Sequence, residues 1–436
     1  MRQLHTELLK HIDETVTIAG WLYKKRLLGG LNFLVIRDRS GLTQVLVEDE
    51  KEVAKLETLQ LGSVLQIEGK VFKDERAPGG VEIHEPTINV LTAVHDVMPI
   101  EIDKPISHKP EHLDSLFEHR VLSLRNTTEQ QIFKVQAGVE AILRDQLLAR
   151  GFIPFHSPKI LAEPTEGGAE TFQLDYFDRS ATLAQSAQFY KQMMVGVYER
   201  VFEVGGTYRA EPSLTTRHMS EYITVDVEMG FIESFADIKN LLSELIYNLN
   251  EQIWKTCESE LTMLNAKPAK LTKQIPELPM HELHELFFKQ TGEDTRGEKD
   301  PTPAEERFAS EYALKKWGSE AVYITDFPTA EMKFYHMINP DNPDVCERAD
   351  LIFRGVEIVT LTQREHRYAI LVEQLKAMGA DPDDPGFKYY LQAFQYGMPP
   401  HGGFGLGLER LTQKIIGLNN VKEATLFPRD MHRLSP

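Results

Sequence analysis

A glycine-rich segment near the end of the chain has the spacing of a ligand-binding turn. Residues 402–407 contain four glycines, and Glu409 and Arg410 follow closely. Glycine has no Cβ, so such a backbone can approach a flat ring or a phosphate. Arg410 falls at the start of a predicted helix, where its guanidinium could cover a purine or meet a phosphate. The spacing is neither that of a P-loop nor that of a dinucleotide fingerprint, and a turn that only packs tightly is the simpler alternative.

A second group of charged residues lies in the middle of the chain. Arg209 and the pair Arg217-His218 surround a loop, and Asp226 and Glu228 follow on the predicted return strand. Burying charges on adjacent strands is costly without partners, so an ordinary core strand would not carry them. They could form an ion-pair network, but two arginines and a histidine around a loop favour a polyphosphate ligand.

A third group consists of two acids separated by a short hairpin. Asp350 and Glu357 are hard oxygen donors, and Mg²⁺ is commonly held by one or two carboxylates together with substrate phosphates. The alternative is a structural salt bridge from Asp350 to Arg354. Together with the arginines, this pair predicts a site that activates a nucleotide.

The elements that must position these groups are antiparallel strands with helices on one side. The apolar spacing predicts a long helix at 131–149, and the strand after it ends at Pro158; this could be a dimer edge or a plain core helix. Residues 165–172 form a glycine-hinged loop that resembles a lid, and helix 187–198 carries Lys191. Because no regular strand-helix-strand alternation is present, we expect an α+β fold.

The N-terminal region has the pattern of a small barrel. Strands are predicted at 16–28, 31–37, 42–47, 63–72 and 81–92, with a helix at 50–59 between the third and fourth. This order is typical of an OB-fold β-barrel. The basic run 24–26, with Phe33 and Gln44 on the next strands, favours single-stranded nucleic acid, since an aromatic ring stacks a base and an amide reads its edge. A barrel with no nucleic-acid role is the alternative.

Length and composition limit the number of domains and the class of protein. The 436 residues allow two or three domains, which we place at 1–98 (barrel), 99–130 (an aperiodic, proline-punctuated hinge) and 131–436 (catalytic domain). No apolar run is long enough for a membrane span, and two distant cysteines suit a reducing, cytoplasmic location. The net charge of −18 argues against a general nucleic-acid coat and against a DNA-binding protein, but it leaves room for a local basic face.

In this order the motifs resemble those of class II aminoacyl-tRNA synthetases of the aspartate/asparagine/lysine subgroup, most closely the archaeal-type aspartyl enzymes. Motif one resembles the helix and strand ending at Pro158, motif two the stretch 208–218, and motif three the segment 403–410. The resemblance covers essentially the whole chain. It implies a class II catalytic domain on an antiparallel sheet, an OB-fold anticodon-binding domain, a homodimer formed through motif one, and the substrates ATP, L-aspartate and tRNA.

The resemblance also implies roles at the ATP site. Arg209 would hold the α-phosphate and the amino acid carboxylate, and Glu211 would contact the adenine amino group. Arg217 and His218 would face the γ-phosphate, while Arg410 would cover the adenine and reach the γ-phosphate. Arg209 and Arg410 are thus the expected catalytic residues.

The resemblance implies a Mg²⁺ site as well. Asp350 and Glu357 would hold the metal, Glu357 would contact ATP, and Thr360 keeps a hydroxyl where relatives often place a metal-linked serine. Relatives usually show two glycines shortly before the Gln-Arg pair, whereas this chain has Leu361-Thr362. Leu361 could narrow the amino acid pocket or shift a strand.

The amino acid pocket implied by the resemblance has two parts. Its six residues are Glu166, Ser186, Gln188, Lys191, Asp226 and Arg364. The ammonium group would be met by Glu166, Gln188 and Asp226. Lys191 and Arg364 would hold the side-chain carboxylate, and an amide would leave the lysine unpaired, so aspartate is favoured over asparagine.

In the barrel, Phe33 matches a base-stacking phenylalanine, Gln44 an anticodon-reading glutamine, and Glu82 an acid on a later strand. Enzymes restricted to tRNA(Asp) tend to carry tryptophan and lysine near the positions of Tyr23 and Pro78. Pro78 resembles the relaxed enzymes that also charge tRNA(Asn). We therefore expect tRNA(Asp) as a substrate and tRNA(Asn) as a second one.

Two alternatives keep the fold. One is an asparaginyl-tRNA synthetase, and the other is a paralogue that activates an amino acid without charging tRNA. The Leu361-Thr362 departure favours these alternatives, whereas the complete set of ATP and metal residues and the intact barrel speak against the second.

Overall fold

The computed structural model describes residues 1–27, 31–164, 170–212 and 215–436. The chain divides into two compact units, Met1–Glu129 and Gln130–Pro436. No described helix is long and apolar enough to cross a bilayer.

The first unit contains the predicted barrel. Its strands close in the order β1-β2-β3-β5-β4 around a core that includes Leu22, Leu34, Val45 and Ile67. The elements are β1 (Thr15–Leu27), β2 (Asn32–Arg37), β3 (Leu42–Val47), α1 (Glu50–Glu57), β4 (Val64–Lys73) and β5 (Val81–Thr92). Number, order and approximate bounds agree with the sequence, and the OB-type barrel is confirmed.

The segment 99–130 is more regular than its sequence suggested. It contains α2 (Pro110–Glu118) and α3 (Arg120–Ser123), where an aperiodic stretch was expected. Pro110 occupies the first turn of α2, a position that needs no backbone N–H donor. Leu113, Leu116 and Phe117 form a small cluster, and the buried Arg120 pairs with Glu129 at 3.0 Å. The stretch expected to be aperiodic therefore contains two helices, and Leu113, Leu116 and Phe117 have the i, i+3, i+4 spacing of an apolar helix face.

The second unit is built on one eight-stranded sheet with the order β12-β13-β16-β17-β18-β11-β10-β6. All neighbours pair antiparallel except the two end pairs, β12 with β13 and β6 with β10. The strands are β6 (Ile153–Pro154), β10 (Arg200–Tyr208), β11 (Glu221–Gly230), β12 (Glu277–Pro279), β13 (Ala321–Thr325), β16 (Arg348–Phe353), β17 (Val356–Arg364) and β18 (His401–Gly407). The α+β prediction is confirmed.

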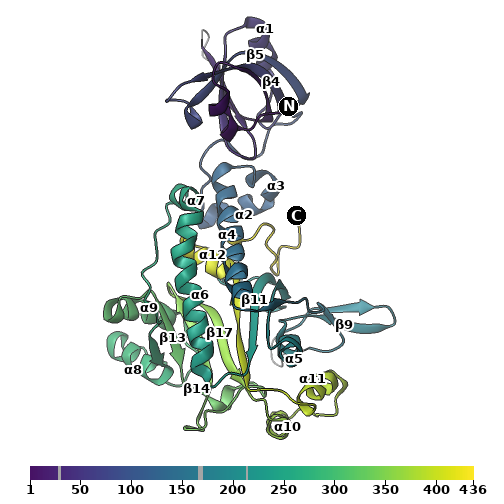
Figure 1. Ribbon diagram of the computed structural model, residues 1–436, viewed down its shortest axis with the longest axis vertical. Coiled ribbons are helices and arrows are strands. Elements are labelled where there is room, and N and C mark those ends of the chain that lie inside the picture. The colour runs from purple at the N-terminus through teal and green to yellow at the C-terminus, as the bar shows by residue number, and fades with distance from the viewer. Residues whose placement is uncertain (28–30, 165–169, 213–214) are drawn as a thin grey trace. The chain divides into compact units, whose positions relative to one another are not determined.

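Helices α4 (Thr127–Ala149) and α6 (Phe235–Thr256) run along one face of this sheet (Figure 1). Their apolar side chains share one core with the strand residues Val227, Phe404, Leu361 and Ala349. These four residues are register partners across β11, β18, β17 and β16. Side chains alternate along a strand, so their neighbours face the opposite side of the sheet, away from this core.

The remaining elements surround the sheet. The helices are α5 (Gln188–Tyr198), α7 (Glu258–Met263), α8 (Met280–Thr291), α9 (Pro303–Trp317), α10 (Tyr368–Ala377), α11 (Pro385–Gln395) and α12 (Leu408–Ile416). The short strands are β7 (Ile160–Leu161), β8 (Gln173–Tyr176), β9 (Arg179–Leu183), β14 (Phe327–Pro328) and β15 (Val345–Cys346). Strand β13 ends at Thr325, where Asp326 has a positive φ of 60°, and a 3₁₀ turn follows at Thr329–Glu331.

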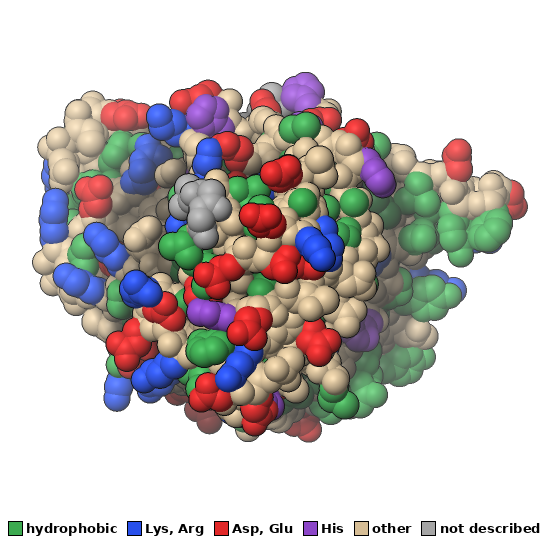
Figure 2. Space-filling model, turned by 90° about the horizontal axis from the view of Figure 1, so that it is seen from above, with side chains coloured by type: hydrophobic (Ala, Val, Ile, Leu, Met, Phe, Trp, Pro, Cys, Tyr) green, Lys and Arg blue, Asp and Glu red, His purple; other side chains and the backbone are tan. Residues whose placement is uncertain are grey.

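Acidic and basic side chains are interspersed on the face of the molecule seen in Figure 2. The net charge of −18 is therefore not gathered there into one acidic surface. The same view shows hydrophobic side chains along the hairpin of β8 and β9, which projects at the right in Figure 1. Phe177 in its turn is 90% exposed.

Candidate functional site

The sheet face opposite α4 and α6 carries two rows of register partners. The first row consists of Asp226, Gly405, Thr360 and Asp350, and the second of Glu228, Gly403, Thr362 and Arg348. All four members of the first row line one cavity of about 620 Å³. A cavity of this size is in the usual range for small-molecule sites. The strands thus bring together residues that lie more than a hundred positions apart.

The glycine segment forms β18 and leads directly into α12, as predicted. Gly405 and Gly407 line the cavity, and a Cβ on Gly407 would meet nothing closer than the Arg410 side chain at 3.7 Å. Gly403 has a different role, since a Cβ there would lie 2.0 Å from the Val227 carbonyl and 2.3 Å from Glu228 Oε2. Glycine is required at Gly403 for packing, while Gly407 leaves room for a ligand.

A bulge in β17 decides which side chains of that strand enter the cavity. Leu351 pairs with Val359 but the next residue, Ile352, pairs with Glu357, so β17 has one extra residue. Glu357 and Thr360 consequently both face the cavity, and Leu361 packs fully buried in the core. The expectation that Leu361 narrows the pocket or shifts a strand is wrong, since β17 stays in register with β18 from Val359 to Arg364.

Two buried cations lie at one end of the cavity, each beside an acid of β11. Lys191 Nζ donates to Asp226 Oδ1 at 2.9 Å and to the Phe404 carbonyl at 2.9 Å. Arg364 donates from Nε and Nη2 to Glu228 at 2.9 and 3.1 Å. The Asp226 carboxyl also accepts from Thr224 Oγ1 at 2.6 Å; burial raises its pKa, but Lys191 and Thr224 outweigh this and lower it. Asp226 and Glu228 of β11 thus form an ion-pair network with Lys191 and Arg364.

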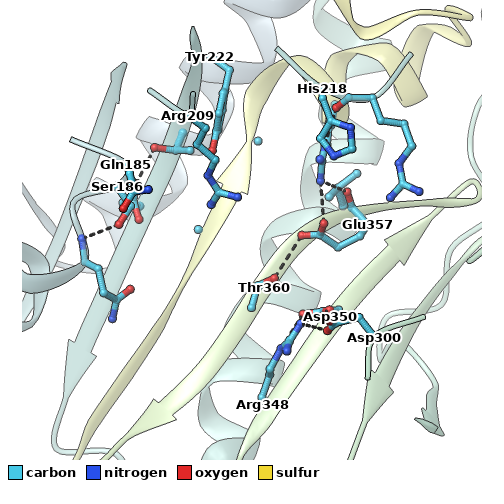
Figure 3. Close-up of a pocket in the computed structure, with 18 of the residues that line it drawn as sticks. Gln185, Ser186, Arg209, His218, Tyr222, Asp300, Arg348, Asp350, Glu357 and Thr360 are labelled. Atoms are coloured by element: carbon cyan, nitrogen blue, oxygen red, sulfur yellow. Dashed lines mark hydrogen bonds and ion pairs between the residues drawn. The ribbon is translucent and has the colours of Figure 1, made fainter. Parts of the chain in front are cut away.

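The predicted phosphate-binding residues lie around the middle of the cavity, where Figure 3 shows Arg209 beside Tyr222 and His218 above Glu357. Arg209 Nη1 is 3.9 Å from Glu211 Oε1, and both side chains are partly exposed. Burial lowers the pKa of His218, and the nearby arginines lower it further against the opposing effect of Glu211, so the neutral form of the ring is favoured. Its Nδ1 lies 2.6 Å from Thr215 Oγ1.

Arg217 has a partner that its sequence neighbourhood does not reveal. Its Nη2 donates to both carboxylate oxygens of Glu306 in α9, at 2.6 and 2.9 Å. Burial raises the pKa of Glu306, and Arg217 opposes that shift. The buried Nε of Arg217 has no partner among the described residues. An oxyanion in the cavity would satisfy this donor.

Arg410 reaches from the first turn of α12 to Glu357. Its Nη1 donates to Glu357 Oε2 at 2.7 Å and to the Glu357 carbonyl at 3.0 Å. Thr360 Oγ1 donates to Glu357 Oε1 at 3.2 Å. Burial raises the pKa of Glu357, but Arg410 outweighs this and the pKa is lowered. Arg410 and Glu357 thus form an ion pair on the wall of the cavity.

Asp350 is paired with Arg348 and not with Arg354, which rules out that alternative. Arg348 Nη2 lies 2.8 Å from Asp350 Oδ2 and 2.9 Å from Asp300 Oδ1, as Figure 3 shows. Arg354 instead bonds to Glu320 and to backbone carbonyls. Burial raises the pKa of Asp350 to about 6, the neighbouring Glu357 adds to the rise, and Arg348 opposes it.

The donor chemistry of this pair suits Mg²⁺. Asp350, Glu357 and Thr360 offer two carboxylates and a hydroxyl on one cavity wall. The described part of the chain has no group of three or more acids, histidines or cysteines that could by itself hold a metal ion. Mg²⁺ bound by few protein ligands keeps the remaining positions for water and phosphate oxygens. The residues fit a metal that arrives together with a nucleotide.

The predicted ammonium-binding residues are described only in part. Glu166 lies outside the described residues. Gln188 lines the cavity, and its buried Nε2 has no partner among the residues described. Ser186 also lines the cavity, and its Oγ accepts from the Gln188 backbone N–H at 3.0 Å. Asp226 already accepts a hydrogen bond from Lys191.

The predicted anticodon residues all lie in the barrel. Gln44 and Glu82 are register partners, and Gln44 Nε2 donates to Glu82 Oε1 at 2.6 Å. Phe33 is partly buried and is not a member of the barrel core. Tyr23 is buried, with its hydroxyl 3.2 Å from Thr127 Oγ1, so it offers no open surface. Pro78 starts a short 3₁₀ turn, Pro78–Gly80.

Three cavity residues had no assigned role in the sequence. Arg348 stands two positions before Asp350 on one strand, and this spacing alone puts the two side chains on one face. Glu306 comes from a distant helix and carries no local signal. Asp300 precedes the same helix and reaches the site through Arg348.

Known proteins match both units. Residues 112–431 match the family of class II tRNA synthetases (D, K and N), and residues 16–91 match the OB-fold nucleic acid binding domain. The aspartate–tRNA(Asp/Asn) ligase of Methanopyrus kandleri is 41% identical over 97% of this chain and 96% of the relative. The aspartate–tRNA(Asp) ligase of Pyrococcus abyssi is 39% identical over 97% and 96%.

A solved structure matches over nearly the full length of both chains. It is the asparaginyl-tRNA synthetase of Pyrococcus horikoshii in complex with asparaginyl-adenylate. The match has 30% identity and a TM-score of 0.89, and covers 98% of this chain and 97% of the other. With a family model covering most of the chain and relatives matching from end to end, this chain belongs to the class II tRNA synthetases of the D, K and N family.

Proposed function

We propose that the chain is an aspartate–tRNA ligase that activates L-aspartate with ATP and transfers it to tRNA(Asp). The relatives named aspartate–tRNA ligases support this proposal at 36–41% identity. The choice between aspartate and asparagine depends on the residues around Lys191 and Arg364.

The observation that carries the proposal is the set of hydrogen-bond donors at that end of the cavity. Arg364 has five N–H groups, and the described residues accept from three of them. Lys191 has three, and two have protein acceptors. The remaining donors suit a carboxylate, which only accepts. An amide would turn its own N–H₂ toward these donors, and a buried unmatched donor costs about 1–3 kcal/mol.

The reaction needs no protein nucleophile. An oxygen of the aspartate α-carboxylate attacks the α-phosphorus of ATP, and the bond to pyrophosphate breaks. Arg209 and Arg410 line the cavity and are proposed to neutralise the charge on the phosphate oxygens in the transition state. Arg217 and the neutral His218 are proposed to orient the pyrophosphate leaving group. The terminal ribose hydroxyl of tRNA then attacks the aspartyl-adenylate, and AMP leaves.

Asp350, Glu357 and Thr360 would hold Mg²⁺. When bound, the ion would neutralise phosphate oxygens and help orient the pyrophosphate leaving group. Binding the metal requires that Asp350 be ionised and that Arg348 and Arg410 yield part of their contacts with the two acids. These arginines are then available to phosphate oxygens in the same cavity.

The barrel is proposed to bind the anticodon. Phe33 would stack a base, and the bonded pair of Gln44 and Glu82 would read base edges. We extend the proposal to tRNA(Asn), because Pro78 departs from the restricted enzymes and the Methanopyrus kandleri relative is named an Asp/Asn enzyme.

We also propose a homodimer in the cytoplasm. β6 is the edge strand of the large sheet, and Ile153 on it and Leu148 beside it are 41% and 46% exposed. An exposed apolar edge of this kind is a common dimer surface. The two free, buried cysteines suit a reducing compartment. Light scattering of the purified chain measures its mass and tests the dimer.

Amino-acid-dependent pyrophosphate exchange tests the activation step. With ATP and labelled pyrophosphate, we expect exchange to depend on aspartate and to be at least about a hundredfold slower with equal asparagine or lysine. Asparagine-dependent exchange would favour an asparaginyl enzyme instead, a candidate that the match to the Pyrococcus horikoshii structure keeps open.

A further inference from the structure

Thr362 contacts Arg364 directly, inside the row of side chains that faces the cavity side of the sheet. Arg364 Nη1 donates to Thr362 Oγ1, while Nε and Nη2 of the same guanidinium donate to Glu228. The two acceptors come from different strands, β17 and β11. The guanidinium is therefore held on two sides.

The row across the sheet explains how both partners can reach one side chain. Glu228, Gly403 and Thr362 are consecutive register partners on β11, β18 and β17. The middle position has no side chain, and a Cβ there would collide with the Glu228 carboxylate. Arg364 follows Thr362 by two positions on the same face, so its guanidinium extends over the gap at Gly403 toward Glu228.

The burial of Thr362 argues against a purely space-filling role. Its side chain is 1% exposed and does not line the cavity, whereas Arg364 does. A hydroxyl is costly to bury unless it is hydrogen-bonded, and valine would fill the same space without that cost. Leu361, the neighbouring departure from the expected glycines, faces the opposite side and packs in the core.

We propose that Thr362 is a positioning residue that fixes the Arg364 guanidinium and thereby sets the affinity for the side-chain carboxylate of the amino acid. This inference rests on the proposed function. With Glu228 and Thr362 in place, one N–H on each terminal nitrogen of Arg364 is left without an acceptor among the described residues. Two N–H groups at the end of a guanidinium match one carboxylate.

Three variants of Thr362 and one control test the proposal. Thr362→Val keeps the volume and removes the hydroxyl, Thr362→Ala removes it without new branching, and Thr362→Ser retains it. The control is Thr325→Val, which changes a buried threonine of β13 in the same sheet that does not line the cavity. Aspartate-dependent pyrophosphate exchange gives kcat and the KM values for aspartate and ATP.

We expect Thr362→Val and Thr362→Ala to raise the aspartate KM about tenfold or more, with kcat and the ATP KM within about twofold of the original. Thr362→Ser should keep the aspartate KM within about threefold of the value for the original chain, and Thr325→Val should leave it unchanged. The preference for aspartate over asparagine should fall together with the affinity for aspartate. If Thr362→Val does not fold, Thr362→Ala answers the same question.

An unchanged aspartate KM in the valine or alanine variant would overturn the proposal. So would a serine variant as impaired as the valine variant, because only the hydroxyl distinguishes them in this argument. Failure of the proposed function is separate, since it would appear as no aspartate-dependent exchange in the unaltered chain.

Discussion

The four buried charged residues described at the proposed amino acid end of the cavity are paired within the protein. Lys191 is opposed by Asp226, and Arg364 by Glu228. The four charges sum to zero, so net attraction does not select an anion here. We propose that selection comes from the direction of the unused N–H groups, which would meet an acceptor in a carboxylate and a second donor in an amide.

Lys191→Met tests this argument at a single residue. We expect aspartate-dependent exchange to fall at least about a hundredfold, because one donor is lost and Asp226 keeps an uncompensated buried charge. ATP binding, measured by calorimetry, should remain within about threefold, since the phosphate-binding residues lie elsewhere in the cavity. The matched control is Lys376→Met on the exposed side of α10. An unchanged aspartate KM in Lys191→Met would refute the pocket assignment.

At the level of strands, the bulge in β17 is the element that sequence patterns did not reveal. Strict alternation from Glu357 would put Val359 and Leu361 in the cavity. The extra residue switches which side chains face each side of the sheet beyond it. The cavity face therefore carries Thr360, Thr362 and Arg364, and Leu361 lies in the core. A bulge is decided by the partner strand, and a single strand's sequence contains no information on that pairing.

Leu361→Ala tests on which face of β17 the Leu361 side chain lies. Because Leu361 is fully buried in the main core, its truncation should lower the free energy of unfolding by about 2–5 kcal/mol. The aspartate KM should stay within about twofold if the side chain points away from the cavity. Leu351→Ala, in the same core on β16, should lose a similar amount of stability. A large rise in the aspartate KM with unchanged stability would show that Leu361 faces the substrate.

The junction of α12 and β11 predicts a pH dependence of stability. Glu409 is buried, and both of its carboxylate oxygens lie about 3 Å from the Ile223 backbone N–H. Burial raises its pKa from 4.5 to about 7. Between these values the folded chain keeps a proton that the unfolded chain releases, so stability falls as the pH rises through this window, by up to about 3 kcal/mol.

Glu409→Gln should remove that dependence. The amide can still accept from Ile223 but does not ionise, so the variant should gain thermal stability relative to the original chain at pH 8 and little at pH 5. Melting curves at both pH values, compared with an exposed control such as Glu373→Gln, measure the effect. An equal stability difference at both pH values would contradict the raised pKa.

Much of the architecture is readable from sequence because its signals are local. The barrel strands alternate over six or more residues, and the glycines of β18 mark a strand that must pass close to its neighbours. The partners Glu306 of Arg217 and Glu228 of Arg364 are not readable, since 89 and 136 positions separate the members of each pair. Residues 99–130 were expected to be aperiodic, although Leu113, Leu116 and Phe117 of α2 have helical spacing, because the pattern covers little more than one helical turn.

At the scale of the whole molecule, we propose that amino acid activation and anticodon recognition belong to different units. Phe33→Ala in the barrel should therefore raise the KM for tRNA roughly tenfold, the scale of one lost base-stacking contact. Aspartate-dependent pyrophosphate exchange should remain unchanged. The control Tyr396→Ala removes an exposed aromatic ring from the catalytic unit and should affect neither activity. A loss of exchange in Phe33→Ala would show that the two activities are not separated in this way.

The most direct test of the central claim is the charging of unmodified tRNA transcripts with labelled aspartate. We predict that the full chain, with ATP and Mg²⁺, forms aspartyl-tRNA(Asp) and also aspartyl-tRNA(Asn), and that asparagine yields neither product. Formation of asparaginyl-tRNA would contradict the assignment of the amino acid. Aspartate-dependent pyrophosphate exchange without any charged tRNA would contradict the assignment as a tRNA ligase.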